Sequence, residues 1–136
     1  MLDPLNVPAV DPNEMLSRFV LSRRHINQQA KTVKADAFVP HPYDELSVTR
    51  QLDATDAEIW SVGEDVAAAR QPRKTLYGRG DVLAATYLGQ MLDVVPDPIV
   101  GNPNHVVVLN WPADDRAAQI LIAKEIAAVA KYIAKP

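Results

Sequence analysis

The clearest feature of the hydrophobic pattern is a short apolar run between two prolines, in Asn-Pro-Asn-His-Val-Val-Val-Leu-Asn-Trp-Pro at 102–112. A run of this length, apolar at consecutive positions, is typical of a central strand that is covered on both faces. We therefore predict a strand over 105–110. Polar residues stand at its ends, where a sheet can present side chains to a ligand.

A second strand is predicted at 45–50, because Glu-Leu-Ser-Val-Thr-Arg alternates polar and apolar residues with a period of two. This period places Arg50 on the same face as the apolar residues. Thr55 and Glu58 follow with the spacing of a capping box, which predicts a helix running to about residue 70.

The rest of the pattern predicts shorter elements and one long helix. Asp-Pro-Asn-Glu has the residue order of a helix start and predicts a short helix over 12–18. We also expect a short helix over 81–88, a strand over 91–95 and a long C-terminal helix over 115–134.

These elements predict an α+β fold with a single domain over 13–136. We expect a roughly four-stranded mixed sheet, covered by two or three helices that include the long C-terminal one. Residues 1–12 contain three prolines and have no hydrophobic period, so we expect an extended N-terminal arm.

Composition narrows the protein class. The chain has 136 residues, a formal net charge of −3 and no cysteine. The absence of cysteine excludes disulfides, thiol catalysis and cysteine-ligated metal sites, and it favours a cytoplasmic location. The first twenty residues lack a secretory pattern and no apolar stretch is long enough for a membrane span, so we expect no membrane association.

Charge is distributed in blocks along the chain. Residues 18–34 carry five basic residues and no acidic one, residues 35–69 carry eight acidic residues and one arginine, and residues 70–79 are again basic. The blocks either neutralise one another on the folded surface or combine the two basic segments into a patch for phosphate, nucleic acid or an acidic partner.

One group of candidate site residues lies in and just before the strand predicted at 45–50. His41 stands between two prolines in a stiff segment and is followed by Tyr43. Arg50 lies on the apolar face of the strand, so it requires an internal acidic partner, a bound anion or an exit to water.

The other candidates are Arg79, Asn104 and His105. Arg79 lies in Tyr-Gly-Arg-Gly-Asp, a glycine-rich turn with backbone N–H groups that could hold a phosphate. His105 begins the central strand and could act as an acid, a base or a structural hydrogen-bonding group. The three histidines have no metal-ligand spacing, so we expect neither a metal nor another cofactor.

Leu-Ser-Val-Thr-Arg (46–50), Glu-Ile-Trp-Ser-Val-Gly (58–63), Asn-Pro-Asn-His (102–105) and Asn-Trp-Pro (110–112) resemble segments of small uncharacterised bacterial proteins. The resemblance covers about residues 41–130. It implies a bacterial, cytoplasmic protein and assigns no activity.

Two classes of function remain open. The first is a non-enzymatic accessory protein of a bacterial assembly, which binds a protein partner or a second copy of itself, with the arm as a docking element. The second is a small metal-independent enzyme acting on a nucleotide or RNA phosphodiester. Here His41 and His105 would be the catalytic pair, and Arg50, Arg79, Tyr43 and Asn104 would bind the ligand. Nucleic-acid binding through residues 18–34 and 70–79 is a further possibility.

Overall fold

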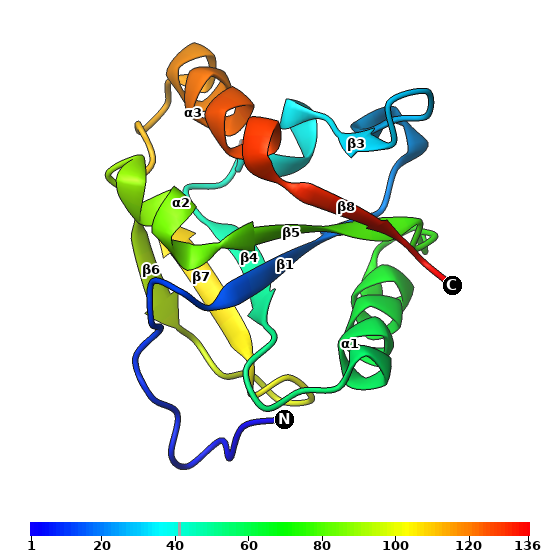
Figure 1. Ribbon diagram of the computed structural model, residues 1–136, viewed down its shortest axis with the longest axis vertical. Coiled ribbons are helices and arrows are strands. Elements are labelled where there is room, and N and C mark those ends of the chain that lie inside the picture. Colours follow the sequence, from blue (N-terminus) through cyan, green and yellow to red (C-terminus); the bar gives the residue numbers. More distant parts are fainter. Residues whose placement is uncertain (41) are drawn as a thin grey trace.

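Six strands form one sheet in the computed structural model, which describes residues 1–40 and 42–136 (Figure 1). The spatial order is β6-β7-β4-β1-β5-β8, and every neighbouring pair is antiparallel. The strands are β1 (Met15–Val20), β4 (Leu46–Arg50), β5 (Gly78–Leu83), β6 (Asp93–Pro96), β7 (His105–Leu109) and β8 (Lys131–Ala134). A separate small hairpin consists of β2 (Ile26–Asn27) and β3 (Thr32–Val33).

Three α-helices and two short 3-10 helices complete the α+β domain. They are α1 (Asp56–Ala69), α2 (Ala84–Gly89), α3 (Arg116–Val129), η1 (Arg23–His25) and η2 (Ala35–Phe38). Within the described part of the chain, no helix has the length and apolar character needed to cross a membrane.

The main core lies on one face of the sheet. Leu16, Val48, Val82 and Val106 point to this face and pack with residues from α2, α3 and η2, including Tyr87, Ile126 and Phe38. The opposite face carries α1, which packs closely on Phe19 of β1 at Gly63. A Cβ added to Gly63 would lie 2.8 Å from the ring of Phe19.

The predicted strand over 105–110 is confirmed as β7, an interior strand between β6 and β4. Its three valines at 106–108 are all buried, although they alternate between the two faces. The predictions of β4 and of α1 with its capping box are confirmed as well.

The prediction of a four-stranded mixed sheet was wrong, because the sheet has six antiparallel strands. The predicted helix over 12–18 is a turn followed by β1, and the predicted helix over 81–88 begins only at Ala84 because β5 occupies the residues before it. The predicted C-terminal helix ends at Val129, and the chain then forms β8 against β5.

The contact between β1 and β4 is unusually short. These strands pair only at Leu16↔Arg50 and Ser17↔Thr49, whereas β1 pairs with β5 over its whole length of six residues. Beyond Ser17 the two strands diverge, and this divergence positions the candidate site.

Candidate functional site

A cavity of about 730 Å³ lies where β1 and β4 diverge. Residues of β1 and β4 line one side of it, α1 lines another, and the β6–β7 connection at 99–102 lines its far end. This volume is in the range of pockets that bind small molecules.

Arg18 lies between the diverging strands. Its Nε donates to the backbone oxygen of Ala37 at 2.8 Å, and its Nη1 donates to the backbone oxygen of Ser47 at 3.0 Å. The second bond satisfies a carbonyl of β4 where β1 no longer runs alongside as a ladder partner. Arg18 therefore fills the gap in the sheet with a guanidinium that lines the cavity.

The charge of Arg18 is not neutralised by a carboxylate among residues 1–40 and 42–136. Burial lowers the pKa of Arg18 to about 10, and the nearby charge of Arg70 acts in the same direction. A guanidinium keeps its charge at neutral pH even with this shift. The cavity thus contains a partly buried cation without a carboxylate partner in the described chain, which favours the approach of an anion.

Further basic groups line the same cavity. Arg70 and Lys74 line it from exposed positions, and the lining residue His25 is half-buried. Burial lowers the pKa of His25. Asp36 opposes this effect, and the charges of Arg18 and Lys34 add to it.

Both basic segments of the sequence, 18–34 and 70–79, therefore contribute to one cavity. The only carboxylate among its described lining residues is that of Asp65, which is exposed.

His105 also lines the cavity, and its orientation is held by Asp97. Its Nδ1 lies 2.9 Å from the backbone oxygen of Asp97 and 3.1 Å from the Oδ2 of the same residue. With both acceptors on Nδ1, this nitrogen carries the proton and Nε2 is left as the basic atom. Thr49 is the cross-strand partner of His105, so both side chains stand on the cavity face of the sheet.

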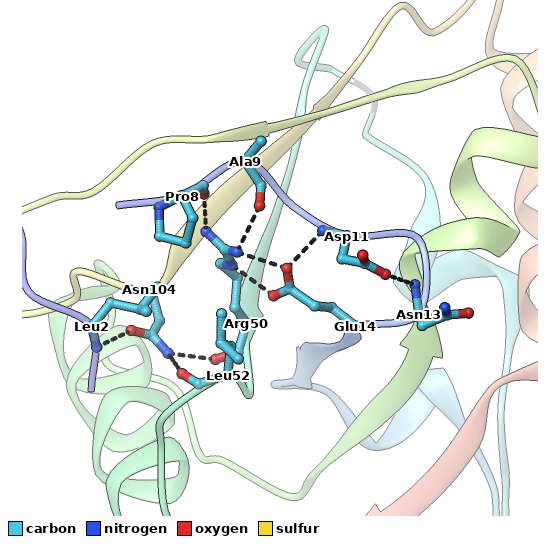
Figure 2. Close-up of polar contacts among 9 residues, drawn as sticks. All are labelled: Leu2, Pro8, Ala9, Asp11, Asn13, Glu14, Arg50, Leu52 and Asn104. Carbon is cyan, nitrogen blue, oxygen red and sulfur yellow. Dashed lines mark hydrogen bonds and ion pairs between the residues drawn. The ribbon is translucent and has the colours of Figure 1, made fainter. Parts of the chain in front are cut away.

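Arg50 lies away from this cavity, in the internal ion pair that the sequence analysis left open as one alternative (Figure 2). Its guanidinium is completely buried and bonds both carboxylate oxygens of Glu14. It also donates to the backbone oxygens of Pro8 and Ala9. The structure thus gives Arg50 a role in holding the N-terminal segment and leaves it no solvent-accessible edge for a ligand.

Arg79 is also buried and has internal partners. Its Nε lies 3.1 Å from Asp81, its Nη2 lies 3.1 Å from Asp56, and its guanidinium stacks 4.8 Å above the ring of Trp60. The Gly-Arg-Gly-Asp part of the Tyr-Gly-Arg-Gly-Asp segment, residues 78–81, belongs to β5 and does not form a phosphate-binding turn. Arg79 is not among the residues that line the cavity.

Asn104 is buried beside Arg50. Its amide accepts from the backbone N–H of Leu2 and donates to the backbone oxygens of Arg50 and Leu52 (Figure 2). Tyr43 is exposed outside the cavity lining. His41 lies outside the described residues. Of the sequence-predicted site residues that are described, only His105 lines the cavity.

Sequence reasoning missed Arg18, His25, Arg70 and Lys74 as individual site residues. The signal was present in the two basic segments that contain them. The described residues contain no group of three or more histidine, aspartate or glutamate side chains arranged to hold a metal ion. Comparison of the chain with protein-family models, with curated proteins and with solved structures gave no match.

Proposed function

We propose that the protein is a non-enzymatic binding protein whose ligand carries a phosphate or carboxylate group, held in the cavity between β1 and β4. The observation that carries this proposal is Arg18, a partly buried guanidinium that lines the cavity and has no carboxylate partner in the described chain. A guanidinium matches the oxygens of either anion, and a low local dielectric strengthens the contact.

The charge distribution supports an anionic ligand. Arg70, Lys74 and His25 line the same cavity as Arg18, and Arg70 and Lys74 are exposed. The chain as a whole has a net charge of −3, so this accumulation of cations is a local property of the site and not a reflection of composition.

Isothermal titration calorimetry with inorganic phosphate and pyrophosphate tests the proposal. We expect saturable binding to the full chain and an increase in melting temperature with ligand concentration. Arg18→Gln should abolish binding. Arg70→Gln combined with Lys74→Gln changes exposed residues only, so it should weaken binding without unfolding the protein. Arg116→Gln, an exposed arginine of α3 outside the cavity lining, is the matched control. Equal affinity in all variants would contradict the proposal.

A second candidate function is catalysis on a phosphodiester, and the His105–Asp97 arrangement favours it. A histidine with its Nδ1 proton held by an acidic residue presents Nε2 as a general base. We expect His105→Asn to abolish hydrolysis of a chromogenic phosphodiester while the fold is retained. Hydrolysis at the wild-type rate in this variant would remove His105 from the mechanism.

We further propose an accessory role in a bacterial cytoplasmic assembly, on the basis of the cysteine-free sequence and of the resemblance to bacterial proteins. The N-terminal segment is bound to its own chain through Arg50 and Asn104, so partner binding would use another surface.

Nucleic-acid binding through residues 18–34 and 70–79 would appear as retention on heparin with a steep dependence on salt.

A further inference from the structure

The cavity has two chemically different ends. Thr49 is the strand partner of both Ser17 and His105. Thr49 and His105 line the cavity, so they mark its end near the short β1–β4 contact. At the other end, Tyr77 N–H donates to the backbone oxygen of Val20, and Lys74 N–H donates to that of Ala67. The segment that carries Lys74 therefore lies beside the end of β1, and the cavity extends from the Thr49 end towards this basic one.

Apolar side chains form much of the wall between the two ends. Val62 and Val66 are four residues apart on α1 and therefore share one face of that helix. Phe19 lines the cavity from β1, on the sheet face towards α1. A ligand that consisted only of a phosphate or carboxylate group would leave these side chains without contacts.

The β6–β7 connection adds two exposed apolar residues at the end remote from Lys74. Ile99 and Asn102 exchange backbone hydrogen bonds of 3.1 and 3.0 Å, which close a tight turn with Val100 and Gly101 at its tip. Ile99 is 50% exposed and Val100 is fully exposed, yet both line the cavity.

This turn is held firmly against β4. The side-chain amide of Asn102 donates to the Oγ1 of Thr49 at 3.1 Å, and its oxygen accepts from the backbone N–H of Asn104. The two aliphatic side chains therefore stand at the cavity mouth on an anchored support. Adjacent exposed aliphatic groups at a pocket mouth are typical of a binding surface.

We infer that the ligand is an amphipathic anion, in which one phosphate or carboxylate group carries an aliphatic chain. The anionic group lies against Arg18, with Arg70 and Lys74 at the rim. The chain follows Val66 and Val62 towards Ile99 and Val100. This inference rests on the proposed anion site and adds the chemical class of the ligand.

The test compares ligands that differ only in chain length. Calorimetric titrations of the full chain use inorganic phosphate, butyl phosphate and hexyl phosphate, with butyrate and hexanoate as a second series. Each methylene group that leaves water should strengthen binding about fourfold, so the hexyl ligand should bind about 16 times more tightly than the butyl ligand. The series that shows the gain identifies the anionic group.

Two sets of variants test the direction of the ligand. Ile99→Ser combined with Val100→Ser should reduce the gain in affinity with chain length, and the affinity of each variant for inorganic phosphate, which has no chain, is the reference. Both residues are exposed, so the fold should be preserved, and Leu121→Ser on the exposed face of α3 is the matched control. Arg70→Gln with Lys74→Gln should weaken all ligands of a series by the same factor.

Each outcome separates this inference from the proposal on which it rests. If phosphate binds in an Arg18-dependent manner and hexyl phosphate and hexanoate bind no more tightly than their butyl counterparts, the chain-binding inference is wrong and the anion site stands. If no anion binds, both are wrong. If the gain with chain length persists in Arg18→Gln and in the Ile99/Val100 variant, the chains adsorb elsewhere and the inference is overturned.

Discussion

Arg50 and Glu14 form a bidentate ion pair, with Nε–Oε1 and Nη2–Oε2 distances of 2.8 and 2.7 Å (Figure 2). Arg50 ends β4, and Glu14 directly precedes β1. The ion pair therefore links β1 and β4 at the point where their short contact begins.

Removal of the Glu14 carboxylate should strongly destabilise the protein. The guanidinium of Arg50 is fully buried, and without Glu14 it would retain only backbone oxygens as partners. A buried charge that loses its counterion typically costs about 3 kcal/mol or more. We expect this loss in the free energy of unfolding of Glu14→Ala, measured by urea denaturation. Glu125→Ala, an exposed position on α3, is the control, and an equal effect of both changes would show that the pair contributes nothing.

Gly63→Ala should also be destabilising, although alanine is the better helix former. The added methyl group would lie 2.8 Å from the Phe19 ring and 2.9 Å from the Leu76 side chain, so these side chains or α1 would have to shift. Overpacking of this kind costs about 1–3 kcal/mol, which exceeds the gain of about 1 kcal/mol in helix propensity.

Gly89→Ala is the matched control for this change. A Cβ at Gly89 meets no atom within 4 Å, so the substitution should leave the melting temperature unchanged or raise it. A higher melting temperature for Gly63→Ala than for the wild type would show that the packing around α1 adapts without strain.

Loss of the α1 cap should have a moderate effect. Thr55 accepts a bond of 3.1 Å from the backbone N–H of Glu58, and Glu58 accepts one of 3.0 Å in return. Thr55→Ala should lower the free energy of unfolding by about 1 kcal/mol. Thr75→Ala, at an exposed position outside helices and strands, should change it much less. The two threonine variants can be compared in one denaturation series.

His25 should make stability fall as the solution becomes acidic. Burial lowers its pKa below the ordinary value of 6.5, and Arg18 and Lys34 lower it further against the effect of Asp36. The unfolded chain therefore takes up the proton first, and stability that is fully present above pH 6.5 is lost as the pH falls towards the folded-state pKa.

His25→Gln should remove this part of the pH dependence. We expect the variant to show a flatter profile of unfolding free energy than the wild type below pH 6.5, and parallel profiles above it. Identical slopes in the acidic range would show that His25 titrates equally in the folded and unfolded states.

Local sequence patterns were sufficient where an element depends on its own residues. Alternation predicted β4, the apolar run predicted β7, and the spacing of Thr55 and Glu58 predicted the start of α1. In each case the burial or capping that stabilises the element is encoded within a few residues.

Local patterns failed to predict β1, because contacts with residues distant in the sequence determine that this segment is a strand. Glu14 N–H bonds Asp11, and a Glu14 side-chain oxygen accepts from the Asp11 N–H, as at a helix start. The Glu14 carboxylate also binds Arg50, and the following residues pair with β4 and β5 as a strand. A local pattern contains no information about that partner.

The strand β5 was missed because its glycines are required by long-range packing. A Cβ at Gly78 would lie 2.6 Å from the backbone oxygen of Ile133, and one at Gly80 would lie 3.0 Å from Phe38. In the sequence these residues resemble a turn, whereas in the fold they allow β8 and η2 to approach closely. The prediction that the C-terminal helix extends through Ile133 was wrong because these residues pair with β5, which is distant in the sequence.

The candidate site could be predicted only as two basic segments and the single residue His105. Its position depends on the divergence of β1 from β4, which no local pattern indicates. Arg50 was a candidate as a charge on an apolar strand face and Arg79 as part of a glycine-rich segment, and both are held by internal acidic partners.

The two residue pairs Leu16↔Arg50 and Ser17↔Thr49 have a mechanical consequence. They divide the sheet into two wings of three strands, β6-β7-β4 and β1-β5-β8, each with its own continuous ladder. A small rotation of one wing against the other about this hinge would widen or narrow the binding cavity without breaking a hydrogen bond inside either wing.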